Sequence, residues 1–165
     1  MNISAAVSRD LGIGYKNELL FHISADLKRF KELTMGKVIV MGHNTFKSLP
    51  NQKPLPGRKN IVLSRNPELV IPGVFIANTK EQAMEMVSGQ DTFIIGGEEV
   101  YNLFLNDCTR VYLTKVNSSP KADRFFPDLK KKPNWKLETK SKIHHADRHE
   151  FYYCEYINLN IADNR

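Results

Sequence analysis

The stretch FIIGGEEVY, residues 93–101, indicates how the whole chain is organised. A short apolar run ends at two consecutive glycines, Gly96 and Gly97, and a helix-like pattern follows from Glu98. A strand, a tight turn and a helix in this order form part of the repeating unit of α/β sheets. Glycine loses more conformational freedom on folding than any other residue, so a pair of glycines needs a structural reason. Tight backbone packing or the close approach of a bound molecule would supply it.

Short apolar runs and helical patterns alternate along the rest of the chain in the same way. The expected strands cover residues 3–7, 37–42, 60–64, 74–77, 92–95 and 110–117, and the expected helices cover 24–36, 44–49, 80–87 and 98–105. After residue 133, the strand patterns WKLETKS and EFYYCEYIN have no helix between them, which predicts an antiparallel hairpin at the sheet edge. We therefore expect an α/β fold: one domain over residues 1–165 with a mostly parallel central sheet of about eight strands, the C-terminal hairpin and about four flanking helices.

Residues with strong positional preferences mark the helix ends. Ser24 can cap the start of the first helix, and Gly36 can end it. Thr79 and Gln82 have the spacing of a capping box, in which side chains bond to backbone N–H groups of the first turn. The tail from Asn158 is polar and is expected to fray. The inward-facing residues of the first helix are expected to be Leu27, Phe30 and Leu33.

The bulk properties are typical of a soluble protein with one core. The chain has 165 residues, of which 41% are hydrophobic and 25% charged, an ordinary balance for a globular domain. The first residues lack the basic and apolar regions of a signal peptide, and no segment has the roughly 20 apolar residues that span a bilayer. These features predict a cytoplasmic protein that binds no membrane.

The cysteines and histidines do not form a recognisable metal-binding pattern. Cys108 and Cys154 are far apart and belong to no CxxC pair, so we expect reduced structural thiols. His144, His145 and His149 lack cysteine or acidic ligands at metal-site spacing. We expect a polar loop between strands there and no metal site.

The chain is basic, with a formal charge of +6 and a pI near 9.3. A basic balance suits nucleic acid, and it also suits phosphorylated cofactors or polycarboxylate substrates. The run Lys130–Lys132 lies between Pro127 and Pro133 without the interleaved aromatic residues of a base-stacking surface. A small polyanionic ligand is therefore the favoured partner, and no nucleic acid is expected.

Two features near the N-terminus have both ordinary and functional explanations. Gly12 and Gly14 lie in an expected loop after the first strand, but Asn17 stands where a dinucleotide fingerprint needs a third glycine, and no helix begins there. A flexible loop explains them, as does an active-site lid.

Asp26 lies in the first turn of a helix, where the macrodipole alone favours a carboxylate. Its apolar neighbours suit a carboxylate that pairs with two adjacent N–H donors of a ligand.

Three further stretches would gather at the carboxyl edge of the sheet, where α/β proteins bind ligands. Arg58 follows Pro56 and Gly57 on a loop that enters a strand. It could be an ordinary surface arginine in a turn, or its planar guanidinium could bind a carboxylate. GHNT, residues 42–45, leads a strand into a helix N-terminus, an arrangement that suits an anion or ordinary capping. Ser64-Arg65 ends the next strand.

Taken together, these stretches resemble the dihydrofolate reductase family over roughly residues 2–157. The matching motifs are ISAAVS, GIGYKNELLFHI, ADLKRFK, VIVMGHNTFKSL, LPGRKNIVLSR, IIGGEEVY, VYLTKV and ADRFFPD. The resemblance implies reduction of 7,8-dihydrofolate to tetrahydrofolate by NADPH, with hydride transfer to pterin C6 and protonation at N5. It also implies a monomer that supplies one-carbon metabolism and binds antifolate inhibitors.

The resemblance also assigns roles to residues. Asp26 would bind N3 and the 2-amino group of the pterin with Thr114 beside it, Leu19 and Phe21 would complete the catalytic centre, and Arg58 would bind the α-carboxylate of the glutamate tail. The folate walls would be Ala6, Leu27, Phe30, Leu49, Leu55 and Ile95. NADPH would be held by Ala6, Ile13, Gly14, Leu19, Gly42, His43, Asn44, Thr45, Leu63, Ser64, Arg65, Gly96, Gly97, Glu98, Glu99, Val100 and Tyr101. The glycine pair would lie against the cofactor, commonly through a cis peptide.

The chain departs from the family pattern at several positions. Leu20-Phe21 stands where the family usually has Pro-Trp, which removes an indole N–H near the substrate. His43-Asn44 replaces a more usual arginine-containing pair, and Glu99 stands where some relatives have a basic residue. Preference for NADPH would therefore depend on Ser64 and Arg65, with a smaller contribution from His43.

Two other functions remain open at this point. The reductase domain of riboflavin biosynthesis shares the fold and reduces a ribosyl-pyrimidine, although Asp26 within ADLKRF and the LPGR arginine favour folate. A basic α/β protein could instead bind nucleic acid, and its affinity would then fall log-linearly with salt.

Overall fold

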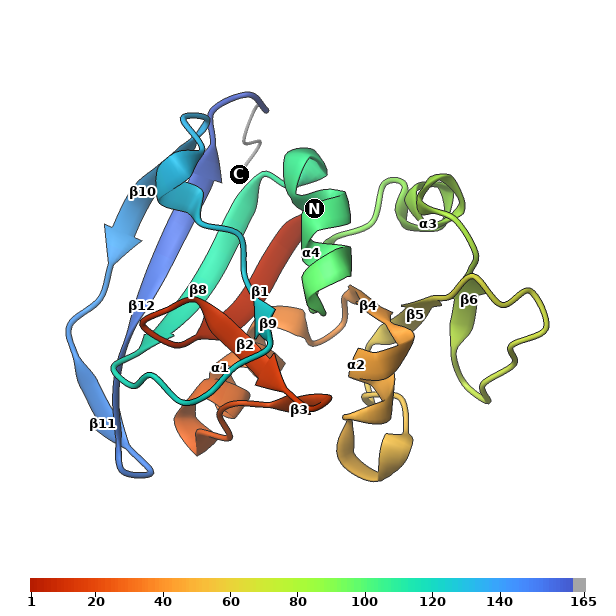
Figure 1. Ribbon diagram of the computed structural model, residues 1–165. Helices are drawn as coiled ribbons and strands as arrows, with labels where there is room; N and C mark the ends of the chain where they lie inside the picture. Colours follow the sequence, from red (N-terminus) through yellow and green to blue (C-terminus); the bar gives the residue numbers. More distant parts are fainter. Residues whose placement is uncertain (162–165) are drawn as a thin grey trace.

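The computed structural model describes residues 1–161 of the 165-residue chain and shows a large twisted sheet flanked by helices (Figure 1). The strand order is β10-β12-β8-β1-β7-β4-β5-β6, and β11 pairs with β12. The strands of this sheet are β1 (Asn2–Val7), β4 (Val38–Gly42), β5 (Lys59–Leu63), β6 (Phe75–Ala77), β7 (Thr92–Ile94), β8 (Arg110–Val116), β10 (Trp135–Lys140), β11 (His144–Ala146) and β12 (His149–Asn158). The expected mostly parallel sheet is confirmed.

The pairing changes direction at one place in the sheet. All pairs from β8 through β1, β7, β4 and β5 to β6 are parallel. Strands β12, β10 and β11 add on antiparallel, as the absence of a helix pattern after residue 133 predicted. A small second sheet contains β2 (Gly12–Tyr15), β3 (Glu18–Leu19) and β9 (Arg124–Phe125), and it covers the end of β1.

Within residues 1–161, four α-helices pack on the two faces of the large sheet. They are α1 (Ser24–Thr34), α2 (His43–Lys47), α3 (Lys80–Val87) and α4 (Glu98–Phe104), and short 3₁₀ turns cover Pro50–Gln52, Leu105–Asp107 and Leu129–Lys131. Alternate side chains of a strand point to opposite faces, so Val38 and Val40 of β4 join one core while Ile39 and Met41 join the other. The first core includes residues of α3 and α4, and the second includes Phe46 of α2.

The start of α1 differs from the prediction that Ser24 is its cap. Ile23 occupies the N-cap position, and its carbonyl accepts the first helical bond from Leu27 N–H at 2.9 Å. The Ser24 N–H and Oγ donate to Asp147 Oδ2 at 2.7 and 2.8 Å. A carboxylate from the turn between β11 and β12 thus replaces the local cap, which no local pattern could indicate.

The capping box at α3 is confirmed with a shift of one residue. Thr79 Oγ1 accepts from Gln82 N–H at 3.0 Å, as expected. Gln82 Oε1 accepts from the N–H of Asn78, rather than Thr79, at 2.7 Å. Both bonds satisfy N–H groups at the start of the helix.

Several segments that were expected to be loops or frayed ends are part of regular structure. The glycines of residues 12–14 lie in β2 rather than in a loop, and His144 and His145 lie in β11 rather than in a polar loop. Asn158 does not fray: it is 4% exposed, and its side chain donates to Cys108 O at 3.0 Å. The expected fraying of residues 162–165 lies outside the described residues. These pairings are long-range, so local composition did not reveal them.

Cys108 and Cys154 are free and buried, in agreement with the expected structural thiols. Burial raises the pKa of the Cys108 thiol to about 12, so it stays protonated at neutral pH. Within residues 1–161, no helix combines the length and apolar character needed to cross a membrane. The same residues contain no group of three or more His, Cys, Asp or Glu placed to hold a metal ion.

Candidate active site

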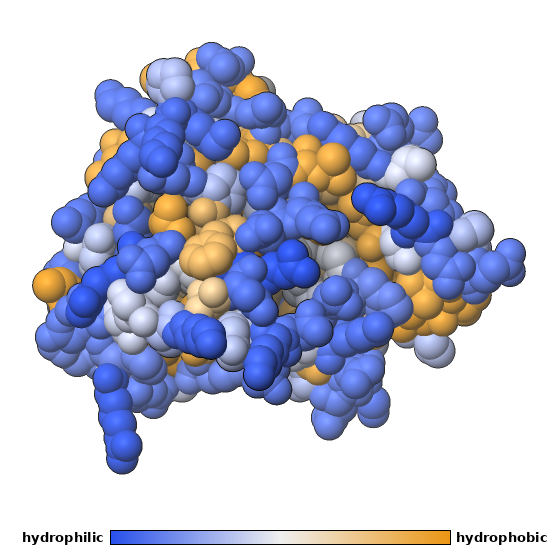
Figure 2. Space-filling model, viewed as in Figure 1, coloured by the Kyte–Doolittle hydropathy of each residue, from blue (hydrophilic) through white to orange (hydrophobic). Residues whose placement is uncertain are grey.

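A cleft of about 1660 Å³ runs along the carboxyl ends of the parallel strands, between α1, α2, α4 and the small sheet. Figure 2 shows this face of the molecule, where hydrophilic side chains predominate and hydrophobic atoms are visible between them. Of the site residues predicted from sequence, all but Thr114 line this cleft. The fold therefore brings together residues that are up to 95 positions apart, from Ala6 to Tyr101.

Asp26 is a partly buried carboxylate in the cleft. It projects from the first turn of α1, and its Oδ1 accepts a hydrogen bond from Thr114 Oγ1 at 2.5 Å. Thr114 is 5% exposed on β8 and pairs in register with Ala6 of β1, which lines the cleft. Thr114 thus lies behind Asp26 and orients it rather than lining the cleft itself.

The environment of Asp26 disfavours its charge. Burial raises the pKa of the Asp26 carboxyl above its ordinary value, while the Thr114 hydrogen bond and the nearby Arg29 guanidinium act in the opposite direction. A carboxylate in such a place gains most from a ligand that offers charged or polarised N–H donors.

Apolar side chains form the walls near Asp26. Leu27 is 51% exposed, so the prediction that it points into the core is wrong, and it faces the cleft instead. A half-exposed leucine is explained when it borders a binding cleft, because a flat apolar ligand can cover it. The other predicted wall residues that line the cleft are Phe30, Leu49, Leu55 and Ile95.

Arg58 lies at the outer end of this apolar region in a fixed orientation. Its Nε donates to Pro56 O at 3.0 Å, and its Nη1 donates to Thr34 Oγ1 at 3.1 Å. Thr34 Oγ1 in turn donates to Phe30 O at 2.8 Å, which ties the arginine to the end of α1. These contacts use two of the five guanidinium N–H donors and hold the planar fork in place for a carboxylate.

The glycine pair lies at the centre of the cleft and packs tightly on its inner side. The Gly96–Gly97 peptide is cis, and Gly96 has φ +128°, a conformation that favours glycine. Gly96 O accepts from Gly42 N–H at 2.8 Å, and a Cβ on Gly96 would lie 3.3 Å from Thr45 Oγ1. The tight-packing explanation is confirmed, because the turn packs against α2. The turn also borders the cleft, so the close approach of a bound molecule stays a prediction.

Two helices begin at the cleft beside this turn. Gly42 and Gly97 are the N-cap residues of α2 and α4, and no side chain of residues 1–161 caps either helix. Uncapped N–H groups at helix starts attract anions such as phosphate groups. This arrangement agrees with the prediction that GHNT suits an anion.

The charged groups near these helix starts differ in how they could contribute. Arg65 and Ser64 line the cleft just after β5. Burial lowers the pKa of His43, and Lys47 lowers it further, so His43 is mostly neutral at pH 7. Glu98 Oε1 accepts from Phe125 N–H at 2.6 Å and so connects α4 to β9.

Leu19 and Phe21 occupy different positions at the edge of the cleft. Leu19 is 49% exposed at the end of the β2–β3 hairpin, whereas Phe21 is 9% exposed and packs edge-on against His149 with ring centroids 5.5 Å apart. Phe21 offers no polar atom, so its contribution to the cleft is its shape.

The cleft also contains residues that the sequence reasoning missed. Lys31 lies one helical turn after Leu27, a spacing that could have indicated it. Arg124 is brought to the cleft by the pairing of β9 with β2, for which the sequence has no local signal. Other missed lining residues include Ser4, Asn17, Glu18, His22, Asn78, Thr79, Lys80, Glu81 and Asn102.

Comparisons with known proteins agree with this geometry. The family model described as Dihydrofolate reductase matches residues 1–160. The chain is 36% identical to dihydrofolate reductase type 3 of Salmonella typhimurium over 160 residues, which is 96% of each chain. It is 40% identical to the dihydrofolate reductase of Buchnera aphidicola over 145 residues, or 86% of this chain and 89% of the relative.

A solved structure shows the same likeness in three dimensions. Dihydrofolate reductase from Enterococcus faecalis, complexed with NADP(H) and RAB-propyl, superposes with a TM-score of 0.86 at 26% identity and covers 95% of both chains. The chain belongs to the dihydrofolate reductase family.

Proposed function

We propose that the protein reduces 7,8-dihydrofolate to 5,6,7,8-tetrahydrofolate with NADPH in the cleft described above. The observation that carries the proposal is Asp26, a partly buried carboxylate that Thr114 orients and that lies beside apolar side chains in the same cleft as the glycine turn. This arrangement suits a flat heterocycle whose N–H edge reaches the carboxylate while its carbon atoms lie near the turn.

The residues on the other side of the glycine turn fit a dinucleotide cofactor. The uncapped starts of α2 and α4 suit a pyrophosphate, and Gly42, Gly96 and Gly97 keep the backbone accessible between them. When bound there, NADPH supplies the hydride that reduces pterin C6. Gly14 and Leu19, from the small sheet that covers this end of the cleft, would help to exclude water.

Asp26 binds the pterin and stabilises the charge that develops when N5 takes a proton from solvent. Its carboxylate accepts from N3–H and the 2-amino group, which fixes the ring in one orientation. A charge about 6 Å from the developing cation, at an effective dielectric constant near 20, is worth about 3 kcal/mol. That energy corresponds to about two decades in rate.

The anionic groups of the substrate tail and the cofactor are assigned to residues at the edge of the cleft. Arg58, held by Pro56 and Thr34, binds the α-carboxylate of the substrate's glutamate tail. Ser64 and Arg65 bind the 2′-phosphate that distinguishes NADPH from NADH. Because burial favours its neutral form, His43 contributes less to this preference.

We also propose that Leu20-Phe21 changes the hydration of the substrate site. Phe21 packs against His149 and carries no N–H that could hold a water. Turnover and antifolate affinity are therefore expected to respond to Phe21→Trp. We further propose that the protein acts as a monomer in the cytoplasm, as its resemblance to the family implies.

The decisive experiment is loss of NADPH absorbance on addition of dihydrofolate to the purified protein. The assay is repeated with NADH and with the ribosyl-pyrimidine substrate of the riboflavin pathway. Rapid oxidation with dihydrofolate and NADPH only is expected. Oxidation with the ribosyl-pyrimidine, or none with dihydrofolate, would contradict the proposal.

A further inference from the structure

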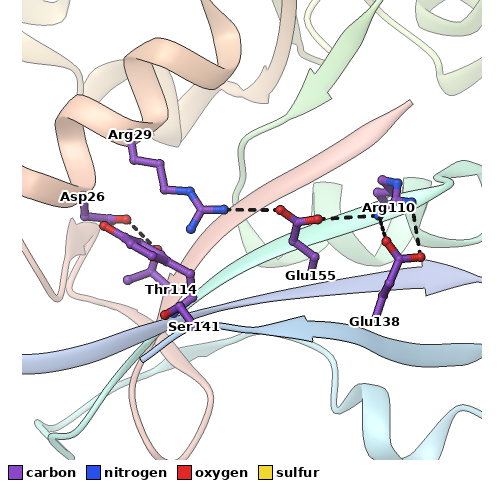
Figure 3. A network of polar contacts seen from close by, with 8 residues as sticks. Asp26, Arg29, Arg110, Thr114, Glu138, Ser141 and Glu155 are labelled. Atoms are coloured by element: carbon purple, nitrogen blue, oxygen red, sulfur yellow. Dashed lines mark hydrogen bonds and ion pairs between the residues drawn. The ribbon is translucent and has the colours of Figure 1, made fainter. Parts of the chain in front are cut away.

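A row of alternating charges extends from beside Asp26 to the outer strand of the sheet (Figure 3). Arg29 Nη2 lies 3.7 Å from Glu155 Oε1, and Glu155 Oε2 lies 3.6 Å from Arg110 Nη1. Arg110 Nη1 and Nη2 bind Glu138 Oε1 and Oε2 at 2.8 and 3.3 Å. The signs run positive, negative, positive, negative from the cleft outward.

Strand register accounts for this row. Tyr153 of β12 pairs with Thr114 of β8, and Glu155 pairs with Tyr112, so these side chains share the sheet face that α1 covers. In β10 the register shifts between Leu137 and Thr139, at the position of Glu138. Such a bulge can redirect a side chain, and the Glu138 carboxylate reaches Arg110 from this position.

Arg110 is the most buried member of the row, whereas Glu138 at its outer end is 36% exposed. The side chain of Arg110 is 6% exposed, whereas those of Arg29 and Glu155 are each 23% exposed. A buried guanidinium needs acidic partners, so Arg110 fixes both Glu138 and Glu155 in place. Glu155 is thereby held where it can bind Arg29.

Arg29 is held from two directions. It lies three residues after Asp26 on α1, so both side chains are on the same part of the helix surface. Its guanidinium carbon lies 3.9 Å from the centroid of the Tyr153 ring, and Glu155 binds its Nη2. A stacked and ion-paired arginine keeps its charge at a fixed place relative to Asp26.

The groups around Asp26 have opposing effects on its charge. The groups that face this region are Arg29 and Glu32 of α1, Thr114 and Arg110 of β8, Tyr153 and Glu155 of β12, and Glu138 of β10, with Glu18 and His22 in the same cleft. Burial raises the pKa of Asp26, and Arg29 lowers it. Burial raises the pKa of Tyr153, and the nearby Asp26 charge raises it further.

We propose that Arg29, held by Glu155 and Tyr153, is a positioning residue that favours the carboxylate form of Asp26 and so sets the pH range of dihydrofolate reduction. The inference rests on the proposed function, because it assigns Asp26 to the pterin. Arg110 and Glu138 act through Glu155. These two residues lie at the far end of the row of alternating charges, and they influence Asp26 only by holding Glu155 in place.

Two substitutions test the proposal because they should act in opposite directions. Arg29→Met removes the charge and keeps a side chain that can pack on Tyr153, so Asp26 should become harder to ionise. Glu155→Gln keeps a side-chain oxygen that can accept from Arg29, and Arg29 stays stacked on Tyr153, but the negative charge is lost. Arg29 is then less neutralised, so Asp26 should ionise at lower pH. Arg29→Lys retains the charge and should stay close to wild type. Lys28→Met removes an equal charge from an exposed site on the same helix and should change nothing.

The direct measurement is carboxyl carbon NMR of the ligand-free protein over a pH series. The Asp26 signal is the one that disappears in Asp26→Asn. The second measurement is the pH profile of dihydrofolate turnover. The midpoint pH of this profile should rise for Arg29→Met and fall for Glu155→Gln. At a fixed pH near the midpoint, turnover should change about threefold, as expected for one partly solvated charge. Thermal unfolding establishes that each variant is folded. If Glu155→Gln does not fold, the proposal is tested by comparing the Asp26 midpoints of Arg29→Met and Arg29→Lys.

The possible outcomes are distinct. Opposite movements of the Asp26 midpoint, followed by the turnover profile, support the proposal. An unmoved midpoint, movement in the same direction for both variants, or an equal effect of Lys28→Met would overturn it. Because the NMR titration needs no substrate, a wild-type protein that fails to reduce dihydrofolate would refute the proposed function without being confused with these results.

Discussion

The two halves of the cleft recognise their ligands by different means. The half beside α1 uses side chains: the Asp26 carboxylate, the Arg58 guanidinium and apolar walls such as Leu27. The half beside α2 and α4 uses backbone, with Gly42 and Gly97 at uncapped helix starts within the described chain. A substitution in the first half can change chemistry and leave the fold intact, whereas one at a glycine of the second changes the backbone itself.

The difference also appears in stability. Burial raises the pKa of Asp26, so the folded protein favours its neutral form. A group of this kind contributes stability below its unfolded pKa and loses that contribution as pH rises through the higher folded pKa. At neutral pH the carboxylate is therefore an energetic cost that ligand binding offsets. The glycine turn carries no such pH-dependent cost.

The largest effect should come from the side-chain half. Asp26→Asn keeps the hydrogen bond to Thr114 but removes the charge, so turnover at pH 7 should fall about 100-fold with partial recovery in acid. NADPH affinity should stay the same. Steady-state kinetics and fluorescence titration of NADPH measure the two effects. Glu85→Gln, at an exposed position of α3 outside the cleft, is the matched control. Unchanged turnover of Asp26→Asn at pH 7 would refute the assignment.

The second-largest effect is expected at Arg58, at the outer end of the side-chain half of the cleft. Arg58→Met should raise the KM for dihydrofolate about 30-fold, because a charge-assisted contact to the glutamate tail is worth about 2 kcal/mol. A pterin substrate without the glutamate should be reduced equally well by both proteins. If the truncated substrate is affected to the same extent, Arg58 does not bind the tail.

In the backbone half, Gly96→Ala should weaken folding and cofactor binding together. The alanine would have to keep the backbone φ of +128°, and its new Cβ would lie 3.3 Å from Thr45 Oγ1. Together these should cost about 2 kcal/mol of stability. NADPH affinity should fall about tenfold. Gly89→Ala is the control, since Gly89 also has a positive φ but open space around it. A stable Gly96→Ala protein with normal NADPH affinity would show that this turn does not form the cofactor site.

The smallest effect should appear in cofactor choice. Arg65→Ala should reduce the preference for NADPH over NADH about fivefold, because one exposed cation contributes about 1 kcal/mol to phosphate binding. The ratio of kcat/KM for the two cofactors measures this. Equal losses with NADPH and NADH would mean that Arg65 does not recognise the 2′-phosphate.

The sequence predicted most of the parallel sheet and the residues that line the cleft. β4 and β7 are short apolar runs, and residues such as Asp26 and Arg58 lie in motifs specific enough to indicate a family. The alternation of short runs and helices also predicted where these motifs meet, because the carboxyl ends of parallel strands share one edge.

Features that depend on distant partners could not be predicted. Asp147 bonds to the start of α1 across 123 positions, and the β2–β9 pairing brings Arg124 to the cleft. The ionic row behind Asp26 requires the register of β8, β10 and β12 and the bulge at Glu138. Neither residue spacing nor composition encodes these contacts locally.

The most direct test of the account is thermal unfolding of wild type and Asp26→Asn, each with and without folate. At pH 7 the ligand-free variant should melt about 3 °C above wild type, and the difference should vanish in acid, where the carboxyl is neutral. Saturating folate should reverse the order by stabilising wild type much more. A ligand-free variant no more stable than wild type, together with equal stabilisation of both proteins by folate, would contradict a partly desolvated carboxylate dedicated to the pterin.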